Sequence, residues 1–205
     1  AGNDVKWREN IYKIANPLNP IDILDIATGT ADIALELSKI KDSKVTGLDI
    51  SEKMLDVGRQ KVADRNLNDK VVLISGDAEN LNFSKNSFDL ISIGFGVRNF
   101  QNLEKGISES FRVLRNGGTL IILETSVPQN RFIKFFYLLF SRTFIPLVGS
   151  VFSKDKKAYK YLQKSAEEFP SGKKFGQILK SCGFNSVEIL PLMLGASSIY
   201  IAKKN

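Results

Sequence analysis

A unit of strand, turn and helix recurs along residues 21–124, and this rhythm restricts the fold more than any other feature of the sequence. Short apolar runs alternate with helical patterns of about ten residues, which favours parallel strands joined by right-handed helical crossovers. The expected strands cover 21–27, 45–50, 71–75, 88–94 and 119–124, and the expected helices between them cover 32–40, 52–65 and 103–114.

Further elements are expected at both ends of this unit. A helix over 7–15 precedes it, and a pair of prolines should end that helix. Two β-like runs, 185–190 and 197–202, close the chain with Pro191 and Gly195 in the turn between them. We therefore expect an α/β fold with a doubly wound, mostly parallel sheet of seven strands, in which the C-terminal strand is antiparallel.

The rhythm is interrupted after Pro128 by a segment that is dense in aromatic residues and poor in charge. Helices are expected near 155–168 and 172–182, after which the strands resume. The chain is interpreted as one domain over 1–205, with a helical insertion at 131–170 that caps the substrate side of the sheet.

Two residue counts restrict the chemistry. The chain has no His and a single Cys, Cys182. A His base, a Ser–His–Asp triad and an internal disulfide are therefore excluded, and a zinc site would need carboxylates alone. We expect no metal and no oxidising compartment.

The charge balance of 29 basic against 22 acidic residues gives +7, which favours nucleic acid, an anionic membrane surface or an acidic ligand as partner. Residues 1–7 are polar and do not resemble a signal peptide. The uncharged stretch 143–153 is far shorter than the roughly 20 residues that span a bilayer. We expect a cytoplasmic protein.

Three carboxylates stand at the ends of successive expected strands, on Asp25, Asp49 and Asp77. Asp49 lies some 20 residues beyond the first strand. This is about the spacing at which an acid accepts hydrogen bonds from the hydroxyls of a ribose. The alternatives are a helix N-cap for Asp49 and a plain turn around Asp77. Together the three acids suit a ligand with cationic and hydroxyl groups, and S-adenosylmethionine is such a ligand.

The turn after the first strand holds a glycine at Gly29, with Ala27 and Ala31 at the flanking glycine positions of D-x-G-x-G-x-G. A dinucleotide site needs these glycines for close approach of the pyrophosphate. S-adenosylmethionine has no pyrophosphate, so the same turn can serve it.

Two motifs narrow the assignment: GFGVRN at 94–99, and AYKYLQKSAEEFPSG at 158–172. Nearly the whole chain resembles the class I, Rossmann-like S-adenosylmethionine-dependent methyltransferases. The two motifs resemble FGxRN and YxYLxxSxxxFP of the UbiE/MenG family, the quinol C-methyltransferases of ubiquinone and menaquinone biosynthesis. Gly94 stands where that family often has a Ser, and an upstream YDxxN-like segment of the family is expected to be missing.

The resemblance implies C-methylation of a reduced prenylated quinol, with demethylmenaquinol favoured. The residues expected to contact S-adenosylmethionine are Asp25, Gly29, Thr30, Asp49, Met54, Asp77, Ala78 and Gly94.

The expected catalytic residues are Arg98 and Asn99. Loss of a hydroxyl proton makes the ortho ring carbon a nucleophile, and Arg98 could stabilise the quinolate while Asn99 orients the hydroxyl. Arg stays protonated and is a poor base, so water, Tyr159 or Tyr161 would take the proton. The alternative is a structural role, in which the Arg–Asn pair only holds the backbone of its loop in place.

The expected partners are the prenylated quinol, the anionic inner face of the cytoplasmic membrane and a second copy in a homodimer. The aromatic insertion and its lysines at 154, 156, 157 and 160 favour an interfacial approach, or else form a cap with a solvated helix face. Nucleic acid is not expected, because GFGVRN stands where an adenine methyltransferase has (N/D)PP(Y/F) and Cys182 is far from a C5-type nucleophile position. The alternatives are another lipophilic or phenolic substrate, or a non-catalytic membrane-binding relative.

Overall fold

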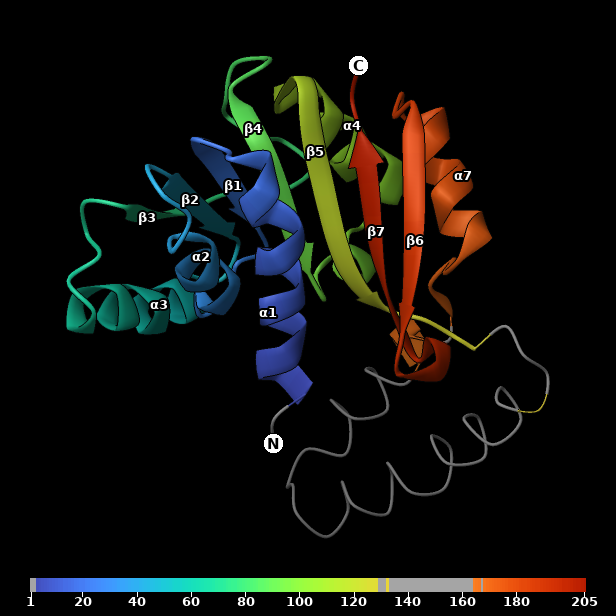
Figure 1. Cartoon of the computed structure of the whole chain (residues 1–205), viewed down its shortest axis with the longest axis horizontal. Helices are drawn as coiled ribbons and strands as arrows, with labels where there is room; N and C mark the ends of the chain where they lie inside the picture. Colours follow the sequence, from blue (N-terminus) through green and yellow to red (C-terminus); the bar gives the residue numbers. More distant parts are fainter. Residues whose placement is uncertain (1–2, 129–131, 133–163, 167) are drawn as a thin grey trace, which may run out of the picture.

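The computed structural model describes residues 3–128, 132, 164–166 and 168–205. Within these residues seven strands form one sheet in the order β3-β2-β1-β4-β5-β7-β6 (Figure 1). Pairing is parallel from β3 to β5, and β7 runs antiparallel to both β5 and β6. The expected doubly wound, mostly parallel sheet is confirmed. The strands are β1 (Asp22–Ile26), β2 (Lys44–Asp49), β3 (Val71–Ser75), β4 (Phe88–Gly94), β5 (Leu114–Thr125), β6 (Ser186–Leu192) and β7 (Ser197–Lys203).

Helices cover both faces of the sheet. Figure 1 shows α1, α2 and α3 on the near side of the sheet and α4 on the far side. The helices are α1 (Asn3–Ala15), α2 (Asp32–Leu37), α3 (Glu52–Asp64), α4 (Leu103–Val113) and α7 (Lys173–Ser181), with 3-10 turns η1 (Asn16–Leu18), η2 (Val97–Asn99) and η3 (Met193–Gly195).

Alternation along the strands produces two buried apolar layers. In β5, Leu120 and Ile122 belong to the layer under α4 and α7, whereas Ile121 and Leu123 belong to the layer under α1, α2 and α3. All four side chains are at most 1% exposed. A central strand that is buried on both faces is expected to have a continuous apolar run, as β5 has from Leu120 to Leu123.

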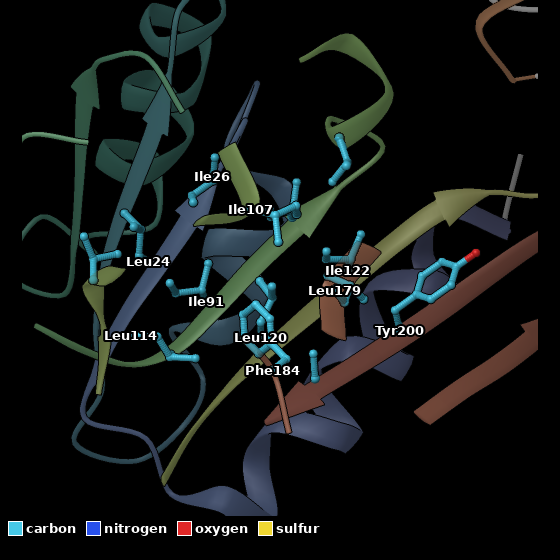
Figure 2. Close-up of a cluster of buried hydrophobic side chains, with 14 of the residues drawn as sticks. Leu24, Ile26, Ile91, Ile107, Leu114, Leu120, Ile122, Leu179, Phe184 and Tyr200 are labelled. Atoms are coloured by element: carbon cyan, nitrogen blue, oxygen red, sulfur yellow. The ribbon is translucent and has the colours of Figure 1, made fainter. Parts of the chain in front are cut away.

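Figure 2 shows the first of these layers, with strand residues facing Ile107 of α4 and Leu179 of α7. Tyr200 of β7 closes the layer, and its ring meets Phe175 edge-on at 4.8 Å between centroids. Its hydroxyl points away from the cluster and accepts the N–H of Gly172 at 2.7 Å. This hydrogen bond anchors the start of α7 to the sheet.

Two expected strand boundaries were wrong. β5 begins at Leu114, directly after α4, and its register against β4 jumps between Leu114 and Thr119. The extra residues loop out around Gly117, which has a φ of +80°. Pro191 lies in β6, opposite Ser198, and not in the turn. β6 is the outermost strand of the sheet, where a proline is tolerated because one side needs no ladder hydrogen bond.

The helix expected over 32–40 ends as an α-helix at Leu37. The next residues form tighter turns, in which the N–H groups of Lys39 and Ile40 bond back three residues. The single domain and the helical cap over 131–170 stay predictions, since nearly all of that segment lies outside the described residues.

Candidate functional site

The carboxyl ends of β1 to β4 meet at one edge of the sheet, beside the point where the strand order reverses between β1 and β4. In open α/β sheets ligands bind in the crevice at this point. Asp25, Asp49 and Asp77 all lie at this edge, as expected from their places at the ends of successive strands.

Asp49 links the glycine turn to the start of α3. Its Oδ2 accepts the N–H of Gly29 and its Oδ1 accepts the N–H of Ser51, both at 2.8 Å. A carboxylate oxygen has two acceptor positions, so each oxygen can still accept a ligand hydroxyl. Ser51 is the N-cap residue of α3, and its side chain makes no capping hydrogen bond.

Asp25 is enclosed, with 1% of its surface exposed. The hydroxyls of Thr28 and Ser92 each donate to it at 2.6 Å. Burial disfavours the ionised carboxyl and raises its pKa to about 6, and these hydrogen bonds oppose that rise. Asp25 therefore holds the turn to two strands, and it is absent from the lining of the cavity described below.

The turn after β1 has the backbone of a glycine-rich loop although two of its glycine positions carry alanine. Ala27, Gly29 and Ala31 have φ values of +54°, +56° and +64°. L-residues with a Cβ rarely adopt this left-handed region. The loop conformation is therefore imposed by its surroundings, including the hydrogen bond from Gly29 to Asp49.

A cavity of about 260 Å³ opens at this edge. Of the expected site residues it brings together Asp49, Asp77, Ala78 and Asn99. The carboxylate of Asp77 is oriented by the N–H of Glu79, which donates to its Oδ1 at 2.8 Å. The remaining lining residues are Ala27, Leu48, Ile50, Gly76, Glu79, Gly96, Phe100 and Gln101.

Thr30, Met54 and Gly94 are not among the residues that line this cavity. The hydroxyl of Thr30 accepts from Lys61 at 2.8 Å and donates to Asp32 at the same distance. Met54 lies beside the turn, and a Cβ built on Gly29 would be 3.4 Å from its Cε. These three residues stay predicted contacts.

The backbone of Gly94 is closed off by a neighbour. A Cβ built at this position would lie 2.2 Å from Cδ1 of Ile33. Ile33 thus occupies the space that a serine side chain would need, which accounts for the missing hydroxyl at Gly94 in packing terms.

Arg98 is paired with Glu124, which was not among the expected site residues. Its Nη1 lies 2.5 Å from Oε1 of Glu124, and its side chain is 10% exposed while that of Glu124 is 0% exposed. The pair joins η2 to the end of β5. A charged residue inside an apolar strand run requires a partner, so the Glu in TLIILET was a signal that could have revealed this ion pair.

Phe95 stands between α1 and Arg98. It has a φ of +54°, a strained conformation for a bulky residue. Its ring lies 5.0 Å from the ring of Trp7 and 5.9 Å from Cζ of Arg98. Such strain persists where surrounding contacts hold it and is common at ligand sites.

A second cavity of about 350 Å³ lies on the other side of Phe100. Arg98 lines this cavity and Asn99 lines the first, while Phe100 lines both. The expected catalytic pair therefore occupies the partition between two cavities. The second cavity is lined by Val97, Arg98, Phe100, Leu103, Lys164, Ser165, Glu168, Phe169 and Pro170.

The described part of the chain has no cluster of three or more potential metal ligands among its His, Cys, Asp and Glu residues. None of its helices is long and apolar enough to cross a bilayer.

The sequence matches the model of the ubiE/COQ5 methyltransferase family over residues 2–204. The chain belongs to this family. Among curated members, it is 38% identical over 204 residues to the demethylmenaquinone methyltransferase of Bacteroides fragilis, covering 99% of this chain and 83% of the relative. It is 41% identical over 182 residues to the demethylmenaquinone methyltransferase of Chlorobaculum tepidum, covering 89% of this chain and 73% of the relative.

Solved structures support the same fold. A SAM-dependent methyltransferase from Aquifex aeolicus superposes with a TM-score of 0.65 at 19% identity, covering 89% of this chain and 81% of that one. A phosphoethanolamine N-methyltransferase from Haemonchus contortus, solved with S-adenosyl-L-methionine, gives 0.69 at 17% identity, covering 97% and 52%. The class I methyltransferase fold expected from the sequence is confirmed.

Family membership makes the chain a methyltransferase. The methyl donor expected from the sequence is S-adenosylmethionine. The first cavity suits this cofactor, since acceptor oxygens of Asp49 and Asp77 line it beside small residues that allow close approach. Ile50 was not among the expected contacts. It is 79% exposed at the cavity, where an apolar side chain can cover a flat ring.

Proposed function

We propose that this family member methylates a ring carbon of demethylmenaquinol. The supporting observation is that Arg98 and Asn99 stand between two cavities, one of which suits S-adenosylmethionine. The name shared by the curated relatives supports a naphthoquinol over a benzoquinol.

S-adenosylmethionine supplies a methyl group bound to a positively charged sulfur. A bond forms between the nucleophilic ring carbon and this methyl carbon, while the carbon–sulfur bond breaks and its electron pair stays on sulfur. The ring carbon then loses its proton and the aromatic ring is restored. Such a displacement depends chiefly on alignment and exclusion of water.

The residues of this chain would act on the oxygen of the quinol. Removal of a hydroxyl proton pushes electron density to the ortho carbon, and the free phenol has a pKa of about 10. The guanidinium of Arg98 can donate hydrogen bonds to the oxygen as it becomes negative. Asn99, in the adjoining cavity, would orient the quinol hydroxyl relative to the methyl group.

The test is the variant Arg98→Lys, which keeps a cation beside the buried Glu124 but loses the planar fork. Transfer of labelled methyl from S-adenosylmethionine is measured with both reduced quinols. We expect kcat to fall about 100-fold and the Kd for S-adenosylmethionine to stay within about twofold. Arg59→Lys, on the exposed face of α3, is the matched control. Equal loss of binding and turnover would contradict the assigned role.

A second part of the proposal concerns the membrane, which holds a prenylated substrate. Met193 and Leu194 form the β6–β7 turn with φ values of +48° and +58°, and the two residues are 51% and 79% exposed. The exposed Lys173 and Lys174 begin α7 at the same end of the sheet (Figure 1). An apolar tip beside cations is suited to an anionic bilayer surface. The lysines at 154, 156, 157 and 160 lie outside the described residues.

Sedimentation with vesicles tests this contact. We expect binding to vesicles that contain phosphatidylglycerol, weakened by salt, and lost in Met193→Asn/Leu194→Asn. Asparagine tolerates positive φ, so the turn is kept. The matched control is Val57→Asn, an exposed apolar position on α3. Equal binding by both variants would contradict the proposal. The homodimer also stays a prediction, for sedimentation equilibrium to test.

A further inference from the structure

We propose that Glu124 is a positioning residue, which acts through Arg98 by fixing the orientation of its guanidinium for methyl transfer. This inference rests on the proposed function. Glu124 lies one residue before the end of β5, at the edge of the sheet that carries the site.

Glu124 holds Arg98 at two places. Its Oε1 accepts from Nη1 of the guanidinium, and its Oε2 accepts from the backbone N–H of Arg98 at 3.3 Å. One carboxylate therefore fixes both the side chain and the η2 backbone from which the side chain extends. With Glu124 fully buried, the ion pair cannot exchange readily with water.

The carboxylate is itself held in place. Oε1 accepts the backbone N–H of Thr125 at 2.7 Å and the Thr125 hydroxyl at 3.1 Å. Four donors thus converge on the carboxylate of Glu124. Its charge is offset by Arg98 and its position is set by the end of β5, as expected of a group that orients another.

Arg98 has donors left over after this pairing. A guanidinium carries five N–H donors, and Nη1 is engaged by Glu124. Nε is buried and has no hydrogen-bond partner among the described residues. Arg98 lines the second cavity, so guanidinium N–H groups that Glu124 does not engage can donate to a phenolate oxygen there. Glu124 therefore determines which edge of Arg98 is available to the quinol.

The pairing also determines the charge. Arg98 and Glu124 together are neutral, so the site offers directed donors without a net cation. Loss of Glu124 leaves Arg98 charged but free to rotate. The proposal therefore predicts a loss of turnover when the carboxylate is removed, although the positive charge remains.

The test is a double-variant cycle in kcat with Glu124→Gln, Arg98→Gln and the two combined. We expect losses of about 10- to 100-fold for Glu124→Gln and about 100- to 1,000-fold for Arg98→Gln. The double variant should match Arg98→Gln within about threefold, because the two residues act as one unit. The KM for S-adenosylmethionine should stay within about twofold, and Glu124→Asp should recover part of the turnover. Glu109→Gln, which removes the Arg-paired carboxylate of α4, is the matched control.

If the loss of kcat in the double variant is the product of the two single losses, the inference is overturned. A Glu124→Gln variant with the kcat of the wild type would also overturn it. Circular dichroism checks folding. Should Glu124→Gln not fold, the cycle is run with Glu124→Asp, which keeps a carboxylate beside Arg98. A wild-type chain that methylates neither quinol refutes the proposed function, whereas an active chain insensitive to Glu124 refutes this inference alone.

Discussion

The carboxylate of Asp25 accepts a 2.6 Å hydrogen bond from the hydroxyl of Ser92, which lies directly opposite it on the neighbouring strand. The bond crosses from β1 to β4, where the strand order reverses. The acid nearest the switch point therefore stabilises the turn and both strands from inside the core. Burial raises its pKa to about 6.

This raised pKa makes stability depend on pH. The folded state binds a proton at Asp25 below about pH 6, whereas the unfolded state does so only near the ordinary value of 3.8. Stability from this group is therefore greatest below pH 4 and falls as the pH rises to 6, by about 2 to 3 kcal/mol. Urea unfolding of the wild type and of Asp25→Asn, from pH 4 to 7.5, measures it.

The informative quantity is the difference between these two proteins, because other groups titrate in both. As the pH falls from 7 to 4, the free energy of unfolding of the wild type should rise relative to that of Asp25→Asn. Ser92→Ala, which removes one donor to the carboxylate, should steepen this gain. Parallel curves for wild type and Asp25→Asn would contradict the raised pKa.

Ala27→Gly should stabilise the protein, contrary to the usual effect of glycine. Ala27 has a φ of +54°, which costs a residue with a Cβ about 1–2 kcal/mol. Glycine removes this strain and costs about 0.5–1 kcal/mol in chain entropy. We expect a net gain of about 0.5–1 kcal/mol by urea unfolding. The control is Ala63→Gly at an exposed helical position, which should destabilise the protein. A loss of stability in both variants would contradict the prediction.

Gly94→Ser should be harmful alone and tolerated with a second change. The new Cβ would lie 2.2 Å from Cδ1 of Ile33. We expect a loss of about 1–3 kcal/mol from overpacking. Ile33→Val removes that methyl group, so the double variant should recover most of the loss. Thermal unfolding of the four proteins gives the coupling energy, and additive effects would show that Ile33 is not the obstacle.

Asp49→Asn should weaken binding of S-adenosylmethionine. The amide loses the charge and places an NH2 group toward the N–H of Gly29 or Ser51, which now donate to the carboxylate. We expect Kd to rise about 10- to 100-fold, or about 1.4–2.7 kcal/mol. Isothermal calorimetry measures it, with the exposed Asp69→Asn as control. Unchanged affinity would exclude Asp49 from the cofactor site.

Much of the fold could be predicted because its signals are local. Apolar runs such as FDLISIG and the helical periodicity around them gave all seven strands, within a few residues at most ends. The boundary of β5 could not be predicted, because the loop at Gly117 depends on its pairing with β4. The place of Pro191 in a strand could not be predicted either, because only the order of strands in the sheet makes β6 an edge strand.

The sequence by itself determined the strand–helix order and the place of three acids at the ends of successive strands, which follow from residue type and spacing. It also carries the motif with Arg98, which was identified by its resemblance to the family. The tertiary structure decided what each acid does: Asp49 and Asp77 line the cavity, Asp25 is buried against Ser92, and Glu124 pairs with Arg98. Asp25 and Ser92 lie 67 residues apart. Such partners meet only when the strands pair, and burial then determines which carboxylates retain access to solvent and ligand.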